Sequence, residues 1–90
     1  MVQARVFVHG RVQGVNFRYY VHRYAAKLGL NGHVRNLYDG RVEILAQGSQ
    51  EDIQKLLDYV RNSPGLSYVV KLDMDWEEPL NSFEGFHITF

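Results

Sequence analysis

The ten residues from His9 to Arg18 combine two glycines, Gly10 and Gly14, with Asn16 and an arginine. Glycine lets backbone N–H groups turn inward into a concave nest, and a helix N-terminus adds unpaired donors and a partial positive charge. The Arg18 guanidinium adds a planar fork of donors that suits phosphate oxygens. Because a strand pattern precedes this run and a helix pattern follows it, the run predicts a small pocket for a phosphoryl group.

Each part of this pattern also has a more ordinary explanation. Two glycines four residues apart are often only turn residues, and an arginine early in a helix is usually solvated. The nucleotide-binding loop Gly-x-x-x-x-Gly-Lys-Ser/Thr is a poor match, because the run has no lysine, no hydroxyl for magnesium and too short a spacing. The prediction therefore rests on the combination and not on any one residue.

Other residue types that carry chemistry are less favourably placed. The four histidines lack the short helical spacing of a zinc site, and the chain has no cysteine to supplement them. The serines have no obvious base nearby in the sequence. We therefore expect neither a metal nor a cofactor.

Length and composition set the class of protein. Ninety residues with 46% hydrophobic content predict one domain, residues 1–90, around a single core. No apolar run is long enough for a membrane span, and the chain enters a strand pattern at Val2, without room for a signal peptide. We expect a cytoplasmic protein.

The charges divide unevenly along a chain whose net charge is zero. Residues 1–42 carry seven Lys or Arg against one Asp, and residues 43–90 carry three against nine acids, which gives net charges of +6 and −6. The basic half contains the candidate anion site, so its field would attract a small anion. The alternative is that the two halves pair across the fold.

Hydrophobic periodicity predicts seven elements. Alternating segments indicate strands over 2–9, 31–37, 41–48, 67–76 and 86–90, with Tyr68, Val70, Leu72, Met74 and Trp76 on one face of the fourth. Helical spacing indicates helices over 17–28, capped by Asn16, and 50–61, capped by Ser49. This order predicts an α+β, ferredoxin-like β-α-β-β-α-β sandwich with an extra short C-terminal strand, an antiparallel sheet and two helices on one face.

The loop around Gly40 decides which side chains share a face. A two-residue turn would place Arg35 on the face of Ile44, whereas a three-residue loop with left-handed Gly40 pairs Val34 with Ile44. The second keeps apolar residues together and turns Asn36 toward the helices. Because two strands joined by a helix run parallel, Asn36 and Arg18 should converge at one edge, where an amide could orient a water molecule. Without this convergence, Asn36 would be read as a turn residue.

Two segments resemble the signatures of the acylphosphatase family. Gly10-Arg-Val-Gln-Gly-Val-Asn-Phe-Arg18 is similar to the first, and Gly32-His-Val-Arg-Asn36-Leu-Tyr-Asp-Gly40-Arg-Val42, continuing to Gly48, is similar to the second. The resemblance covers the whole chain. His33 departs from the aromatic ring that the family usually has after the glycine.

The resemblance implies a metal-independent hydrolase that splits a small-molecule acyl phosphate into carboxylate and phosphate. It implies that Arg18 binds phosphate and Asn36 positions the water, as the two catalytic residues. We expect inorganic phosphate to be both product and inhibitor, the enzyme to be a monomer, and neither nucleic acid nor membrane to be a partner. The expected phosphate-binding residues are Arg11, Val12, Gln13, Gly14, Val15, Asn16, Phe17 and Arg18.

Two binding modules remain as alternatives. A ferredoxin-like fold can bind RNA through aromatic residues on its open sheet face, but the third strand, residues 41–47, has no aromatic ring. A phosphate- or carbamoyl-phosphate-binding domain without turnover is the other, because a fold and an anion nest do not dictate catalysis.

Overall fold

The computed structural model describes all 90 residues as five strands and two helices. No helix is long and apolar enough to span a lipid bilayer. In chain order the elements are β1 (Val2–Arg11), α1 (Phe17–Lys27), β2 (Asn31–Asn36), β3 (Val42–Gly48), α2 (Gln50–Arg61), β4 (Tyr68–Glu77) and β5 (Phe86–Thr89).

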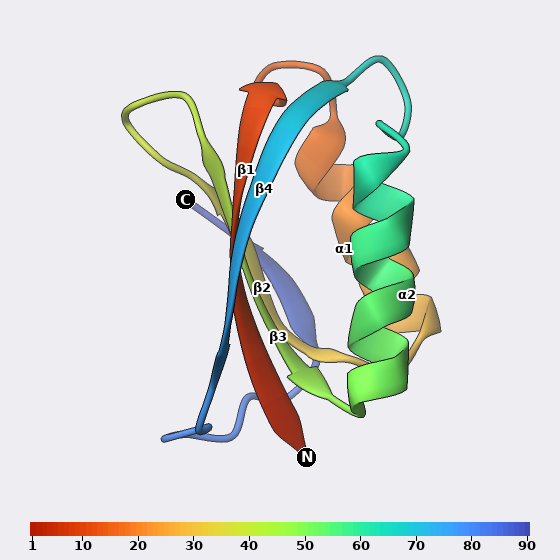
Figure 1. Ribbon diagram of the computed structural model, residues 1–90, viewed down its shortest axis with the longest axis vertical. Helices are drawn as coiled ribbons and strands as arrows, with labels where there is room; N and C mark the ends of the chain where they lie inside the picture. The colour runs from red at the N-terminus through yellow and green to blue at the C-terminus, as the bar shows by residue number, and fades with distance from the viewer.

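The strands form one sheet in the order β4-β1-β3-β2-β5, with both helices on one face, as Figure 1 shows. This is the predicted ferredoxin-like α+β arrangement with an extra C-terminal strand. The expected antiparallel pairing holds among β1 to β4, but β5 pairs with β2 in the parallel sense, so the sheet is mixed. The cause is the segment 78–85, which stays at the end of the sheet where β2 begins, so that β5 runs in the same direction as β2.

The hydrophobic core lies between the sheet and the two helices. Helix α1 buries Phe17, Val21 and Ala25, which lie on one face of the helix. Helix α2 begins as predicted, with Ser49 Oγ accepting a hydrogen bond from the Asp52 N–H at 3.1 Å. The largest fully buried apolar side chains are Phe17, Ile44, Ile53, Leu56, Leu57, Val6, Val8, Val12, Val21, Val34 and Val42.

The β2–β3 hairpin has the predicted register. Val34 pairs with Ile44, Arg35 with Glu43, and Asn36 with the first residue of β3; Gly40 is left-handed, with φ 95°. Since Val34 and Ile44 are buried against the helices, Asn36 faces the helical side. The hairpin and the β1–α1 loop lie at the same end of the sheet (Figure 1).

The prediction for the face of β4 is wrong at its first residues. Opposite His9 and Gly10, β4 contains a β-bulge in which Val70 is the extra residue, so that Val69 packs against the core while Tyr68 and Val70 are exposed. Gly10 permits the close approach, because a Cβ there would clash with the Tyr68 carbonyl. Alternation alone carries no sign of such an insertion.

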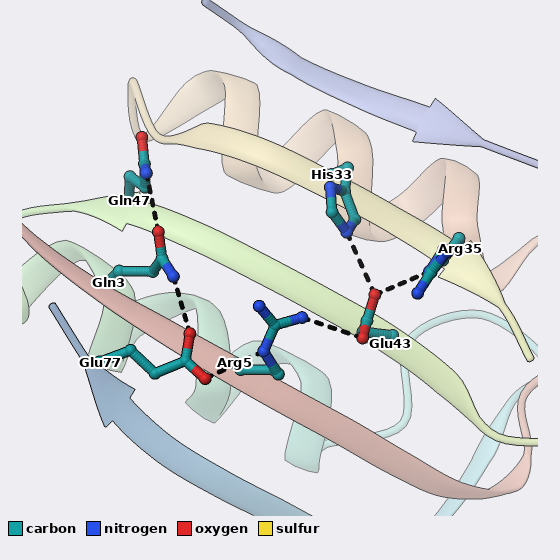
Figure 2. A network of polar contacts seen from close by, with 7 residues as sticks. All are labelled: Gln3, Arg5, His33, Arg35, Glu43, Gln47 and Glu77. Carbon is teal, nitrogen blue, oxygen red and sulfur yellow. Dashed lines mark hydrogen bonds and ion pairs between the residues drawn. The ribbon is translucent and has the colours of Figure 1, made fainter. Parts of the chain in front are cut away.

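The open face of the sheet carries a polar network centred on Glu43, drawn in Figure 2. The Glu43 carboxylate is 2.7 Å from Arg35 Nε, 3.1 Å from Arg5 Nη1 and 3.2 Å from His33 Nε2. Arg5 also donates from Nε to Glu77 at 3.0 Å. His33 therefore lies on the face opposite to that of Asn36, within a network that joins the four strands β1 to β4.

Two opposing influences set the pKa of Glu43. Burial opposes ionisation of this carboxyl, which is only 4% exposed, but hydrogen bonds from Arg35 and His33 and the charges of Arg35 and Arg5 outweigh burial. The pKa of Glu43 is consequently lowered from its ordinary value. The basic first half and acidic second half of the chain thus do pair across the fold here.

Candidate active site

The loop between β1 and α1 has the backbone geometry of an anion nest. Gly14 (φ 76°) and Asn16 (φ 60°) both have a left-handed backbone, whereas Val15 between them does not. None of the backbone N–H groups of residues 12–16 donates a hydrogen bond to a protein acceptor. Such alternation makes a concavity lined by free donors, which is suited to an anion.

The start of α1 strengthens this preference for negative charge. The expected side-chain cap is absent, because left-handed Asn16 makes no side-chain hydrogen bond to the first turn, so that part of the prediction is wrong. The first turn of α1 also contains no acidic residue. The unpaired N–H groups and positive end of the helix dipole therefore keep their capacity to bind an anion from outside the helix.

Arg18, in the first turn of α1, is held by the last residues of the chain. Its Nη1 donates to the Thr89 carbonyl at 3.1 Å, and its Cζ lies 4.8 Å from the centroid of the Phe90 ring. One donor of the guanidinium is thus engaged, and the others have no protein acceptor within hydrogen-bond distance.

Asn36 presents a buried acceptor without a partner. Its Oδ1 is the one buried side-chain polar atom in the structure that makes no hydrogen bond. An orphaned acceptor of this kind costs folding free energy, of the order of 1–3 kcal/mol, and calls for an explanation beyond packing.

These groups share one hollow of about 330 Å³, which we call the loop hollow. It brings together Asn36 with five predicted residues of the loop and α1, which are Val12, Gly14, Asn16, Phe17 and Arg18. The convergence of Arg18 and Asn36 that strand direction predicted is therefore present. The remaining lining residues, which were not predicted, are Tyr19, Ile88 and Phe90.

Three other predicted phosphate-binding residues do not line the loop hollow. The Arg11 side chain is exposed at the end of β1, and Val15 packs against the core. Gln13 turns its side chain toward the β2–β3 hairpin and donates to two backbone carbonyls there. Gln13 and Val15 therefore offer the loop hollow their backbone N–H groups and not their side chains.

Sequence reasoning missed the contribution of the C-terminus. Ile88 and Phe90 line the loop hollow, and Thr89 holds Arg18. The signal was the short final strand: had its parallel pairing with the strand of Asn36 been recognised, its end would have been placed at the same edge of the sheet.

The arrangement offers hydrogen-bond donors, one arginine charge and the amides of Asn16 and Asn36, and the hollow is lined by no serine, threonine, histidine or carboxylate side chain. Nowhere in the structure are three or more His, Asp or Glu side chains grouped so that they could share a metal ion. What the site can do is bind an anion and orient a small polar molecule next to it.

Comparison with known proteins agrees with this geometry. The family model described as Acylphosphatase matches residues 4–88. An acylphosphatase from Roseiflexus sp. (strain RS-1) is 43% identical, over 98% of this chain and 95% of that one.

Solved structures give the same result. The crystal structure of acylphosphatase from Bacillus subtilis superposes with a TM-score of 0.96 at 41% identity, over 100% of both chains. Full-length HypF, solved in a phosphate- and nucleotide-bound form, contains a similar region: it matches 100% of this chain and 12% of its own, with a TM-score of 0.85 at 28% identity. With the family model, the relatives and the hollow in agreement, the chain belongs to the acylphosphatase family, enzymes that hydrolyse the carboxyl–phosphate bond of acyl phosphates.

Proposed function

We propose that the loop hollow is the catalytic site, with the phosphoryl group held by Arg18 and the backbone N–H groups of residues 12–16, and with the attacking water held by Asn36. The observation that carries this assignment is the buried, unpartnered Oδ1 of Asn36 in the same hollow as the free loop donors. A water molecule that donates to Oδ1 would satisfy this acceptor and be held beside the phosphorus.

The reaction then needs no side-chain base or acid. The water oxygen attacks phosphorus, the bond from phosphorus to the carboxyl oxygen breaks, and its electron pair leaves with the carboxylate. Since the acid of this leaving group has a pKa of about 4, like a side-chain carboxyl, it departs unprotonated. The proton of the water passes to an oxygen of the transferred phosphoryl group, and the product is inorganic phosphate.

Stabilisation of charge is the main contribution of the protein. The negative charge on the equatorial phosphoryl oxygens faces the loop N–H groups, the positive end of α1 and the Arg18 guanidinium. Because the Thr89 carbonyl holds one donor of Arg18, the remaining donors are oriented before substrate binds. Inorganic phosphate fits the same donors, so it should inhibit competitively.

The substrate is a small-molecule acyl phosphate. We propose that the enzyme acts as a monomer. Size-exclusion chromatography at the protein concentration of the assay tests this: activity that depends on a dimer would contradict it.

The site of attack is tested by hydrolysing benzoyl phosphate in water enriched in oxygen-18. Attack at phosphorus places the label in phosphate and leaves benzoate unlabelled, as this proposal expects. Label in benzoate would mean attack at the carbonyl carbon and would overturn the assignment of Asn36. Competitive inhibition by unlabelled inorganic phosphate, measured in the same assay, reports separately on the phosphoryl site.

A further inference from the structure

The Gln13 side chain connects the two halves of the site. Its Nε2 donates to the Leu37 carbonyl at 2.7 Å and to the Arg41 carbonyl at 2.9 Å. Gln13 lies in the loop that carries the free N–H donors, and Leu37 directly follows Asn36. Both hydrogens of one amide therefore link the anion loop to the hairpin that carries the water-binding residue.

The two carbonyls that accept from Gln13 also close the hairpin. The Leu37 oxygen accepts from the Gly40 N–H at 3.2 Å, and the Arg41 oxygen accepts from the Leu37 N–H at 2.8 Å. The Gln13 amide thus joins the hydrogen bonds that define the turn at the end of β2. These internal bonds remain if the Gln13 amide is removed, so the turn itself should persist.

We infer that Gln13 is a positioning residue, which fixes the distance and orientation of Asn36 relative to the bound phosphoryl group. This inference rests on the proposed role of Asn36 as the residue that holds water. Gln13 and Asn36 line one neighbouring hollow, together with Leu37, so the tether lies beside the amide that it positions. Misplacement of a reacting group by about 1 Å can cost around 100-fold in rate, so a half-buried tether at this point affects turnover.

This role predicts a specific split between kinetic constants. Gln13→Met keeps the length and volume of the side chain but removes both donors. The phosphate site uses the loop N–H groups and Arg18, which stay in place, so the inhibition constant for phosphate should change less than threefold. Turnover depends on the placement of Asn36, so kcat should fall by about tenfold or more.

The test is a double-mutant cycle on benzoyl phosphate hydrolysis with Gln13→Met, Asn36→Ala and the double variant. If Gln13 acts through Asn36, the double variant should have nearly the kcat of Asn36→Ala, because there is no longer an amide to position. Equal loss of kcat on both backgrounds, or unchanged kcat in Gln13→Met, would overturn the inference. Should Gln13→Met fail to fold, Gln13→Asn, one methylene too short to reach the hairpin, replaces it with the same criteria.

Gln47 provides a matched control on the opposite face of the sheet. Its Nε2 also donates twice, to Gln3 Oε1 at 2.8 Å and to the Asn81 carbonyl, and the side chain is fully buried. Gln47→Met should lower the urea midpoint of unfolding and leave kcat within twofold of the parent. A kcat loss in Gln47→Met equal to that in Gln13→Met would mean a general structural effect and contradict the positioning role.

The cycle also separates this inference from the proposed function. If Asn36→Ala loses turnover and Gln13→Met does not, only the role of Gln13 fails. If Asn36→Ala keeps turnover, the assignment of the water fails, and the role of Gln13 fails with it.

Discussion

Arg18 and Thr89 join the beginning of the first helix to the end of the last strand, through a hydrogen bond of 3.1 Å from Nη1 to the carbonyl oxygen. The Phe90 ring lies 4.8 Å from the same guanidinium. The arginine that we propose to bind phosphate is therefore positioned from outside its own helix, and the C-terminal strand contributes to the candidate site as well as to the sheet.

The Phe90 contact predicts a graded effect on phosphate binding. Phe90→Ala removes a cation–π contact of about 0.5–1 kcal/mol, so phosphate affinity should fall by a few-fold while the Thr89 hydrogen bond remains. Phe90→Tyr keeps the ring and should retain the affinity of the parent. Inhibition constants for phosphate in both variants check this, and equal weakening by the two changes would count against the role of the ring.

Gly14 should be replaceable without loss of fold but with loss of phosphate binding. Its φ of 76° is disfavoured for a β-branched residue, although no atom lies within 4 Å of the position of an added Cβ. Gly14→Val should therefore raise the inhibition constant of phosphate by distorting the nest and not by a clash. Circular dichroism provides the fold control, and unchanged kinetics in a folded variant would refute the nest.

The Glu43 network predicts how stability depends on pH. The pKa of Glu43 is lowered in the folded chain from its ordinary value of 4.5, so its contribution is fully present above about pH 5. As pH falls below the ordinary pKa, the unfolded state binds a proton at Glu43 before the folded state does, so the free energy of unfolding decreases. The contribution of Glu43 is lost once pH has also fallen below the lowered pKa of the folded state.

Glu43→Gln isolates this contribution. It leaves Arg35, Arg5 and His33 without the carboxylate and should cost about 1–3 kcal/mol in free energy of unfolding at pH 7. The gap between parent and variant should narrow in acid, as measured by urea unfolding at pH 7 and near pH 3.5. If the difference in free energy of unfolding between parent and variant is the same at both pH values, the charge of Glu43 does not cause that difference.

Local sequence patterns predicted most of the fold, for identifiable reasons. The hairpin register followed from keeping Val34 opposite Ile44, and that choice alone turned Asn36 toward the helices, as the structure confirms. Strand direction then placed Asn36 beside the loop, which is why two residues 18 positions apart could be assigned to one site.

The features that escaped prediction depend on long-range geometry. The bulge opposite His9 and Gly10 changes which residues of β4 face the core, because Val70 is an extra residue in β4, and its residue type gives no sign of this. The parallel pairing of β5 comes from the path of residues 78–85, so the contact from Thr89 to Arg18 had no local signal. Asn16 was predicted to cap α1 by residue type, but its backbone is left-handed and its side chain makes no hydrogen bond to the first turn.

The assignment of separate roles to Arg18 and Asn36 is the central claim, and a paired comparison of turnover and phosphate affinity tests it most directly. Arg18→Gln removes a charge that meets phosphate in both ground and transition states, so both quantities should fall together. Asn36→Ala removes the contact to the attacking water alone, so turnover should fall by about 10²–10³ while phosphate binds nearly as well as to the parent. A folded Asn36→Ala variant that keeps turnover within a few-fold of the parent would contradict the account.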